Sequence, residues 1–280
     1  MTRGQIARAW EAGRVDVEPC ERPPERGWRV ALDALVFEGD RVLLHGDLVR
    51  VPSRHEYAVL NKPRSVTCTA QDPGHRQDLS RWLQAMPPGM FPVGRLDRAT
   101  TGMLLFTTDG DFSNAMLRPE HHAEKTYWLW LDESLEPNDP RLATMVAGLP
   151  LRGRLARAKR VMVQCRTPDF TELRMVLDQG QNQQIRRMCR ALGLRLVQLH
   201  RLGIGPLRLG TLALGAWRHL EAGEVDALWE AAGGRDLVRE RKIVALRRRA
   251  QRARRAGEPL ERLEAWLERA GVPVDARTRG

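Results

Sequence analysis

The alternation of apolar and polar positions differs along three parts of the chain. In residues 1–52, the stretch 6–10 has the apolar spacing of a short helix, which stops at Gly13. The segment VFEGDRVLLHGDLVRV then alternates apolar and polar residues around the Gly-Asp pairs at 39–40 and 46–47. That pattern predicts strand, turn and strand, so this part is expected to fold as a small α/β unit.

Residues 53–234 mix two kinds of pattern. Strand-like runs are YAVLNKP, GMLLFTT and TYWLWL, and helical runs are SRWLQAM and NQQIRRMCRALG. Strands and helices follow one another without a regular βαβ rhythm, which favours an α+β fold over a doubly wound one. GxGxxG, GxxxxGKS and HExxH are absent from the sequence, so it offers no motif typical of nucleotide cofactors or zinc proteases.

Residues 235–280 are dominated by charge. Here 14 basic residues face 7 acidic ones, and the run RERKIVALRRRAQRARR has little apolar material. One interpretation is a solvated, partly disordered tail, and the other is an arm that orders when it binds phosphates; the two are compatible. The segment PLERLEAWLERAG adds a second short helix with an apolar stripe, which is expected to pack on protein.

Composition points to a polyanionic partner. The chain has 46 Lys and Arg against 35 Asp and Glu, a net charge of +11 and a pI near 10.5, which favours nucleic acid. No stretch of about 18 apolar residues and no signal-peptide pattern occurs in the sequence. The four cysteines form no CxxC pair, so neither a zinc ribbon nor a disulfide framework is expected. We therefore expect a cytoplasmic protein without a membrane span or metal site.

The segment PVGRLDRATTGMLLFTTDGDF, residues 92–112, holds the strongest candidate for chemistry. Asp97 stands beside basic residues in a turn that leads through Gly102 into an apolar strand. A carboxylate held ionised by a neighbouring cation is able to act as nucleophile or base. Taken by themselves, these residues favour an ordinary turn pair of Arg95 and Asp97 over a catalytic site. The acids of TTDGD lack the further ligands of a metal loop and predict a strand-ending turn.

The GRLD turn followed by Thr, Gly and an apolar strand resembles the active-site motif of pseudouridine synthases, in the RsuA/RluB/RluE/RluF branch. Three other segments resemble that branch in the same order: YAVLNKPRSVTCT (57–69), EKTYWLWL (124–131) and the block DQGQNQQIRRMCRALGLRLVQLHRLGIGPLRLGTLALGAWRHLE (178–221). The likeness covers roughly residues 57–230. It implies a pseudouridine synthase fold with a mixed, mainly antiparallel central sheet flanked by helices.

The resemblance implies three catalytic residues and no cofactor. Asp97 is expected to be the catalytic carboxylate, and Arg186, at a strand-to-helix junction, is expected to pair with it. Tyr127 is expected to stack on the uracil and to help remove the C5 proton in the last step. Strand alternation turns Tyr127 away from its tryptophan neighbours and toward the site. The chain departs from the branch at Ala99, where an acidic residue is frequent, and at Gln183, where Arg is frequent.

The expected partner is structured RNA. The MC after QIRR and the phrase LxLGxWRxL are most similar to RluF members, which implies 23S ribosomal RNA, with 16S ribosomal RNA or tRNA as alternatives. The opening segment TRGQIARAWEAGRVDV resembles an S4 RNA-binding domain that lacks its first helix. The expected RNA contacts come from eight basic residues: Lys62, Arg95, Arg98, Lys125, Arg187, Arg190, Arg3 and Arg14.

Two further alternatives remain at this point. A non-catalytic RNA-binding or ribosome-assembly factor on the same scaffold would also use the basic tail and the S4-like unit. DNA binding has little support, because no helix-turn-helix or zinc-finger spacing occurs. The set of Asp97, Tyr127 and Arg186 favours the enzyme, and a monomer is the default expectation.

Overall fold

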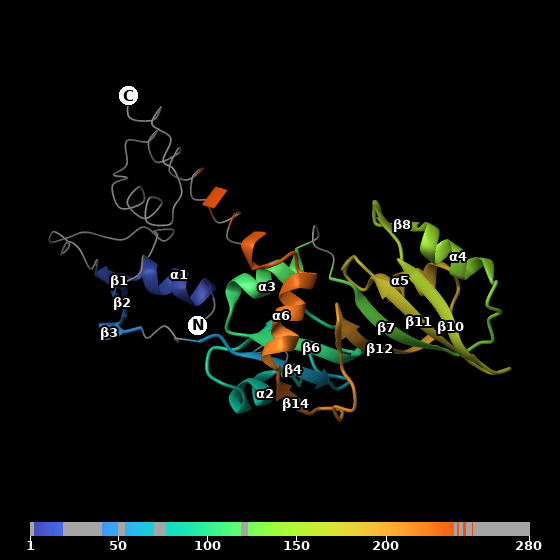
Figure 1. Cartoon of the computed structure of the whole chain (residues 1–280), viewed down its shortest axis with the longest axis horizontal. Helices are drawn as coiled ribbons and strands as arrows, with labels where there is room; N and C mark the ends of the chain where they lie inside the picture. The colour runs from blue at the N-terminus through green and yellow to red at the C-terminus, as the bar shows by residue number, and fades with distance from the viewer. Residues whose placement is uncertain are drawn as a thin grey trace. The chain divides into compact units, whose positions relative to one another are not determined.

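A computed structural model describes residues 3–18, 41–49, 54–69, 77–118 and 123–237, with 240, 243, 244 and 248. The chain divides into two compact units, one of Met1–Arg54 with Arg239–Gly280 and one of His55–Val238 (Figure 1). Each unit is considered by itself below. Most of the basic extension expected over residues 235–280 lies outside the described residues.

The first unit contains a helix and a small antiparallel sheet. Helix α1 spans Arg3–Glu11, and strands β1 (Val15–Glu18), β2 (Arg41–Leu44) and β3 (Asp47–Leu48) pair in the order β1-β2-β3. The predicted helix lies within α1, and Gly13 after it has a φ of 67°. The turn expected at residues 46–47 joins β2 to β3, whereas the one at 39–40 lies outside the described residues. The S4 assignment stays a prediction.

The second unit contains the remaining elements. They are β4 (Tyr57–Lys62), α2 (Ser80–Ala85), β5 (Phe91–Val93), β6 (Thr101–Thr107), α3 (Gly110–Leu117), β7 (Lys125–Leu131), α4 (Pro140–Ala147), β8 (Leu149–Leu151), β9 (Arg154–Ala156), β10 (Arg160–Arg166), β11 (Thr171–Leu177), α5 (Gln184–Ala191), β12 (Leu196–Ile204), β13 (Leu207–Arg208), β14 (Trp217–His219) and α6 (Ala222–Ala231). In the described part of the chain, every helix is too short or too polar to cross a membrane.

A nine-stranded sheet runs through this unit. Its main order is β10-β11-β7-β12-β6-β4-β14, with β13 added to β12 and β5 added to β6. Among the described strands, β12 and β6 form the one parallel pair, and the other pairs are antiparallel. The sheet is therefore mixed and mainly antiparallel, as predicted, and the α+β class is confirmed.

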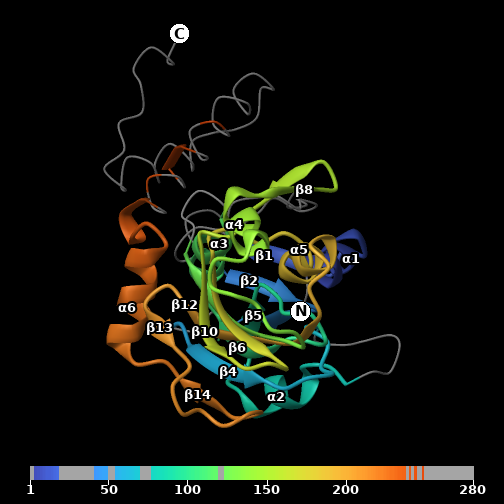
Figure 2. The ribbon, with the colours of Figure 1, turned by 90° about the vertical axis from the view of Figure 1, so that its right-hand side faces the viewer.

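Strand alternation divides the β4–β6 half of the sheet into two packed faces. Val59, Met103 and Leu105 belong to one cluster with buried residues of α3 and α6. Their neighbours Leu60 and Leu104 belong to a second cluster, which includes Trp82 of α2. Figure 2 shows α6 and α2 on different sides of β4 and β6. Because both faces are covered, these strands have near-continuous apolar sequences rather than alternating ones.

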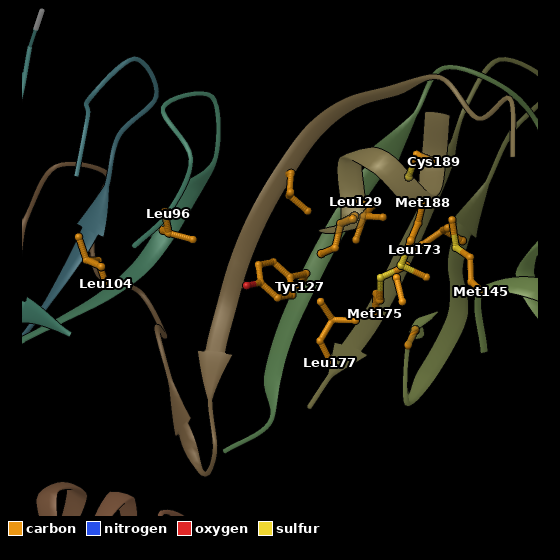
Figure 3. Packing of buried hydrophobic residues seen from close by; sticks show 14 of the residues in the cluster. Leu96, Leu104, Tyr127, Leu129, Met145, Leu173, Met175, Leu177, Met188 and Cys189 are labelled. Carbon is orange, nitrogen blue, oxygen red and sulfur yellow. The ribbon is translucent and has the colours of Figure 1, made fainter. Parts of the chain in front are cut away.

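The β7–β11 half of the sheet is packed by α4 and α5. Its apolar positions continue the second cluster, and Figure 3 shows how they gather around the sulfur-containing side chains of both helices: Leu129, Leu173, Met175, Leu177, Met145, Met188 and Cys189. Since α5 is fixed by this packing, its first turn is held in a defined position beside the sheet.

The structure also contains helices that the sequence pattern did not reveal. The TTDGD segment ends strand β6 at Thr107, as expected, and then starts α3, which was not expected, with Asp109 as its N-cap. The Asp109 carboxylate accepts hydrogen bonds from the backbone N–H groups of Asp111 and Phe112, at 2.9 and 3.1 Å. This is the usual way for an acidic side chain to satisfy the first free N–H groups of a helix.

Gly102 allows the parallel contact between β6 and β12. Its φ is 103°, and a Cβ built on it would lie 2.4 Å from the backbone oxygen of Arg201. Real Cβ atoms do not approach backbone so closely, so this position requires glycine. The crossing lies just after the GRLD turn and therefore sets the distance between that turn and β12.

We expect Gly102→Ala to destabilise the protein strongly. The added methyl group clashes with backbone and the left-handed φ is unfavourable, which together cost about 3 kcal/mol or more. The matched control is Gly223→Ala in α6, where a Cβ meets nothing within 4 Å. That change should be neutral or stabilise by up to about 1 kcal/mol. Urea unfolding measures both, and equal stabilities of the two variants would refute the close-approach argument.

Candidate active site

A pocket of about 290 Å³ lies beside the centre of the sheet in the second unit. That volume is near the lower end of the roughly 300–1,000 Å³ common for small-molecule sites. Its lining includes Asp97 from the loop before β6, Tyr127 from β7 and Arg186 from the first turn of α5. The three residues that the sequence singled out for chemistry thus come together at one site, although they are far apart in the chain.

Neighbouring segments hold the Asp97 loop in place. The backbone N–H of Leu96 donates to Cys68 Sγ at 3.3 Å, and the N–H of Ser65 donates to the Arg98 oxygen at 2.8 Å. Within the loop, the backbone N–H of Thr100 donates to the backbone carbonyl oxygen of Asp97 at 2.9 Å and closes a tight turn. The segment of residues 62–69 therefore contacts the loop on both sides of Asp97. These contacts hold the half-buried Asp97 side chain at the pocket wall.

Tyr127 lies at the border between the core and the pocket. It is 9% exposed and belongs to the apolar cluster with Leu129, while Trp128 between them is half-buried. The predicted alternation along this strand is confirmed. In Figure 3 the hydroxyl end of Tyr127 points away from Met175 and Leu177. The ring thus presents part of its surface to the pocket while the strand fixes its position.

Arg186 holds the Asp97 loop through hydrogen bonds. Its Nη2 donates to the Ala99 oxygen at 3.1 Å and to Thr100 Oγ1 at 3.3 Å, and Nε is buried without a partner among the described residues. The expected direct pairing with Asp97 is not among the hydrogen bonds and ion pairs of the described residues. Burial lowers the pKa of Arg186, and the negative charge of Asp97 opposes that shift. The two groups therefore interact by charge across the loop.

The start of α5 is anchored by a buried amide. Gln184 is 4% exposed, and its Nε2 donates to the Arg157 oxygen at 3.0 Å while its Oε1 accepts from the N–H of Gln181 at 3.1 Å. Gln183 before it adopts a left-handed φ of 50°. Such a conformation is unfavourable for a residue with a side chain and is kept only where its surroundings enforce it. These contacts at the start of α5 thus fix the backbone position of Arg186.

Lys62 was expected to contact RNA, and its position contradicts that prediction. The residue is fully buried, and its Nζ donates to the backbone oxygens of Pro63 and Val66 at 2.9 Å each. The amine closes the turn on which Ser65 holds the Asp97 loop. Lys62 lies at the end of β4, on the face that Ala58 and Leu60 pack into the second cluster. Because its side chain is buried there, it is not exposed to RNA phosphates. Its role is structural.

Two further cations line the pocket. Lys125, one of the expected RNA contacts, is half-buried, and its Nζ donates to the Ala123 oxygen at 3.0 Å. Burial, followed by the positive charge of Arg201, lowers the pKa of Lys125 to about 8. Arg201 on β12 was not singled out from the sequence. The available signal was a charged residue inside the apolar strand run LVQLHRLGI.

The other expected RNA contacts divide by exposure. Arg95 is exposed at the pocket lining, and Arg98 and Arg190 are exposed on the same unit. Arg187 is half-buried and donates to Asn182 Oδ1 at 2.5 Å. Arg14 is exposed on the first unit, and the side chain of Arg3 lies outside the described residues. Their contacts with RNA stay predictions.

Residues 56–191 match the RNA pseudouridylate synthase family. A relative from Aquifex aeolicus (strain VF5), "Uncharacterized RNA pseudouridine synthase", is 31% identical over 206 residues, which are 73% of this chain and 82% of the relative. "Ribosomal small subunit pseudouridine synthase A" of Vibrio cholerae is 29% identical and covers 82% of this chain and 94% of that protein. The family match includes every residue of the pocket lining except Leu199, Arg201 and Ile204.

Two more similarities agree with this result. "Dual-specificity RNA pseudouridine synthase RluF" of Salmonella typhi is 32% identical over 74% of this chain and 70% of that protein. A solved structure titled "Crystal structure of pseudouridylate synthase" has a TM-score of 0.55 and 28% identity, and covers 81% of this chain and 94% of that one. Sequence and structure thus point to the same family.

The buried amine of Lys62 makes a prediction about stability and pH. Burial lowers its pKa from 10.5 to about 8. Between these values the unfolded chain holds more protons than the folded one, so the free energy of unfolding rises with pH. Lys62→Met lacks this group and should lose that increment. Urea unfolding of both proteins from about pH 7 to about pH 10 measures the difference. Lys125 has a similar shift but is present in both, so it cancels; parallel pH curves would contradict the assignment.

Proposed function

The chain belongs to the RNA pseudouridylate synthase family, and from this membership we propose that Asp97 carries out the conversion of one uridine in ribosomal RNA. The enzyme isomerises uridine to pseudouridine in RNA. One observation supports the residue assignment above all: Asp97, Tyr127 and Arg186 line a single pocket. A protein that only binds RNA needs no such set, and family membership favours the enzyme over the non-catalytic alternative.

The reaction needs a carboxylate at the sugar. The N1–C1′ bond breaks, the uracil turns, and a C5–C1′ bond replaces the first one while C5 loses its proton. Asp97 either attacks C1′ or removes the C2′ proton to give a glycal, and both routes need an ionised carboxylate near the sugar. Among the described residues that line the pocket, Asp97 is the one with a carboxylate, which supports its assignment.

Tyr127 acts on the uracil base, and Arg186 acts on the Asp97 carboxylate. The Tyr127 ring, fixed by its strand, offers a flat apolar surface on which uracil stacks. Arg186 supplies positive charge close to Asp97 and holds the loop that carries it. Leaving group and acceptor are the same molecule, so the reaction requires no redox partner and no energy source.

The target base must leave its helix to enter this pocket. Extruding a nucleotide costs a few kcal/mol of stacking and pairing. Exposed arginines around the site, including Arg95, Arg98 and Arg190, offset this cost by binding the phosphates on either side.

The proposed substrate is 23S ribosomal RNA. The RluF-like phrases in the block 178–221 support this choice. A second candidate is 16S ribosomal RNA, because several of the relatives found are named ribosomal small subunit pseudouridine synthase A. Both candidates are folded ribosomal RNAs, which suits a basic protein that reads structure around a single extruded base.

We expect Asp97→Asn to abolish product while leaving the fold and RNA affinity nearly unchanged. The amide keeps the shape of the side chain but is neither a nucleophile nor a base, so turnover should fall by at least about 1,000-fold. Asp169→Asn, in the exposed turn between β10 and β11, carries the same charge change away from the pocket and should be fully active. A fully active Asp97→Asn protein would remove Asp97 from the mechanism.

The substrate is tested by mapping pseudouridines in 23S ribosomal RNA, 16S ribosomal RNA and tRNA from cells with and without the gene. We expect one pseudouridine in 23S ribosomal RNA to disappear on deletion and to return with the wild-type gene but not with Asp97→Asn. Loss of a site in 16S ribosomal RNA instead would favour the second candidate. Unchanged maps of both ribosomal RNAs would contradict the ribosomal assignment.

A further inference from the structure

Arg201 is a buried cation with an unsatisfied donor. It is 4% exposed, its Nε donates to the Met103 oxygen at 2.7 Å, and its Nη2 has no partner among the described residues. A buried charged donor without an acceptor is costly, and native proteins rarely keep one without a reason. Strand β12 nevertheless holds Arg201 rigidly, between β6 and β7. The missing acceptor is therefore expected to come from a ligand.

The position of Arg201 relates it directly to the site. In the sheet register it lies opposite Tyr127 on β7 and opposite Gly102 on β6. Residues directly opposite in an antiparallel pair project to the same face of the sheet, so Arg201 and Tyr127 share the face that lines the pocket. Arg201 thus lies beside the ring on which the uracil is proposed to stack. It also lies opposite Gly102, which follows the loop that carries Asp97.

The charge of the pocket is strongly one-sided. Its described lining has four cationic side chains, Arg95, Lys125, Arg186 and Arg201, against the single carboxylate of Asp97. The cations also disfavour one another, since the charge of Arg201 contributes to the lowered pKa of Lys125. Such a site is matched to a group that is electron-rich or becomes negative, because preorganised donors stabilise developing charge most where water is excluded.

The uracil base fits this requirement better than a phosphate does. Phosphates remain on the RNA backbone and meet exposed cations such as Arg95, whereas an extruded base enters the pocket and is read by hydrogen bonds to its edge. When the N1–C1′ bond breaks, its electron pair stays with the uracil, and the negative charge spreads over N1, O2 and O4. This holds both for attack at C1′ and for the glycal route.

We propose that Arg201 donates a hydrogen bond to a carbonyl oxygen of the extruded uracil and stabilises the negative charge that this base acquires when N1–C1′ breaks. The inference rests on the proposed function of the pocket and adds the group that stabilises the departing base. No proton is transferred by Arg201. The charge is later consumed when C5 bonds to C1′. This bond formation displaces the Asp97 carboxylate or, on the glycal route, is accompanied by return of the proton from Asp97 to C2′; the C5 proton is then released to water with the help of Tyr127.

The test combines an enzyme variant with altered substrates. Arg201→Gln removes the cation, and RNA with 2-thiouridine or 4-thiouridine at the target replaces one carbonyl oxygen by sulfur, a poorer acceptor that also makes the base leave more readily. Single-turnover rates and RNA affinities are measured for each combination. On ordinary uridine we expect a rate about 100-fold slower with little change in affinity. With sulfur at one of the two positions, that defect should shrink to a few-fold.

A purely structural role predicts another result. If Arg201 only supported the sheet, the defect would be the same for all three substrates, and this outcome would overturn the proposal. Arg174→Gln is the matched control, because Arg174 lies on β11, which pairs with β7 on the side away from β12, and it is outside the pocket lining. This variant should be fully active. If Arg201→Gln does not fold, Arg201→Lys replaces it, and its rates on the same three substrates are compared. A wild-type enzyme inactive on all ribosomal RNA would overturn the proposed function as well.

Discussion

The contact between Arg186 and the loop of Asp97 is the constraint on which the site depends. A guanidinium from the first turn of α5 donates to Ala99 and Thr100, which follow Asp97 by two and three residues. It joins a loop before β6 to a helix that starts about ninety residues later in the chain. The core under α5, the amide anchor of Gln184 and the Gly102 crossing all serve to bring these two segments to the right distance.

The same arrangement explains how a basic protein keeps a working carboxylate. Three of the pocket's four cations, Lys125, Arg186 and Arg201, lie on strands or at a helix start, so their charge is fixed before any substrate arrives. Lys62 is part of this design although it touches no ligand: its buried amine shapes the turn that holds the Asp97 loop. The arginines proposed to bind phosphates are exposed, whereas Arg186 is half-buried and Arg201 is buried. The proposed catalytic and RNA-binding charges thus differ in depth.

Local patterns in the sequence predicted the strands, because strand alternation is a local property. The three residues that meet in the pocket were assigned from the resemblance to pseudouridine synthases, since the residues of the Asp97 turn by themselves indicate only an ordinary turn. Long-range packing was not readable. Lys62 was assigned to RNA because of its charge, although the apolar run that precedes it is typical of a strand covered on both faces. Arg201 was missed for the opposite reason, because its role depends on lying across from Tyr127. The N-cap role of Asp109 was not predicted, because α3 is short and its sequence has only weak helical periodicity.

The central claim, that Arg186 positions the Asp97 loop for chemistry, is tested most directly by single-turnover kinetics of Arg186→Ala beside Arg195→Ala, an exposed arginine outside the pocket lining. We predict that Arg186→Ala binds RNA with nearly normal affinity but forms product at least about 100-fold more slowly, whereas Arg195→Ala keeps the wild-type rate. Product formation by Arg186→Ala at the wild-type rate would contradict the account.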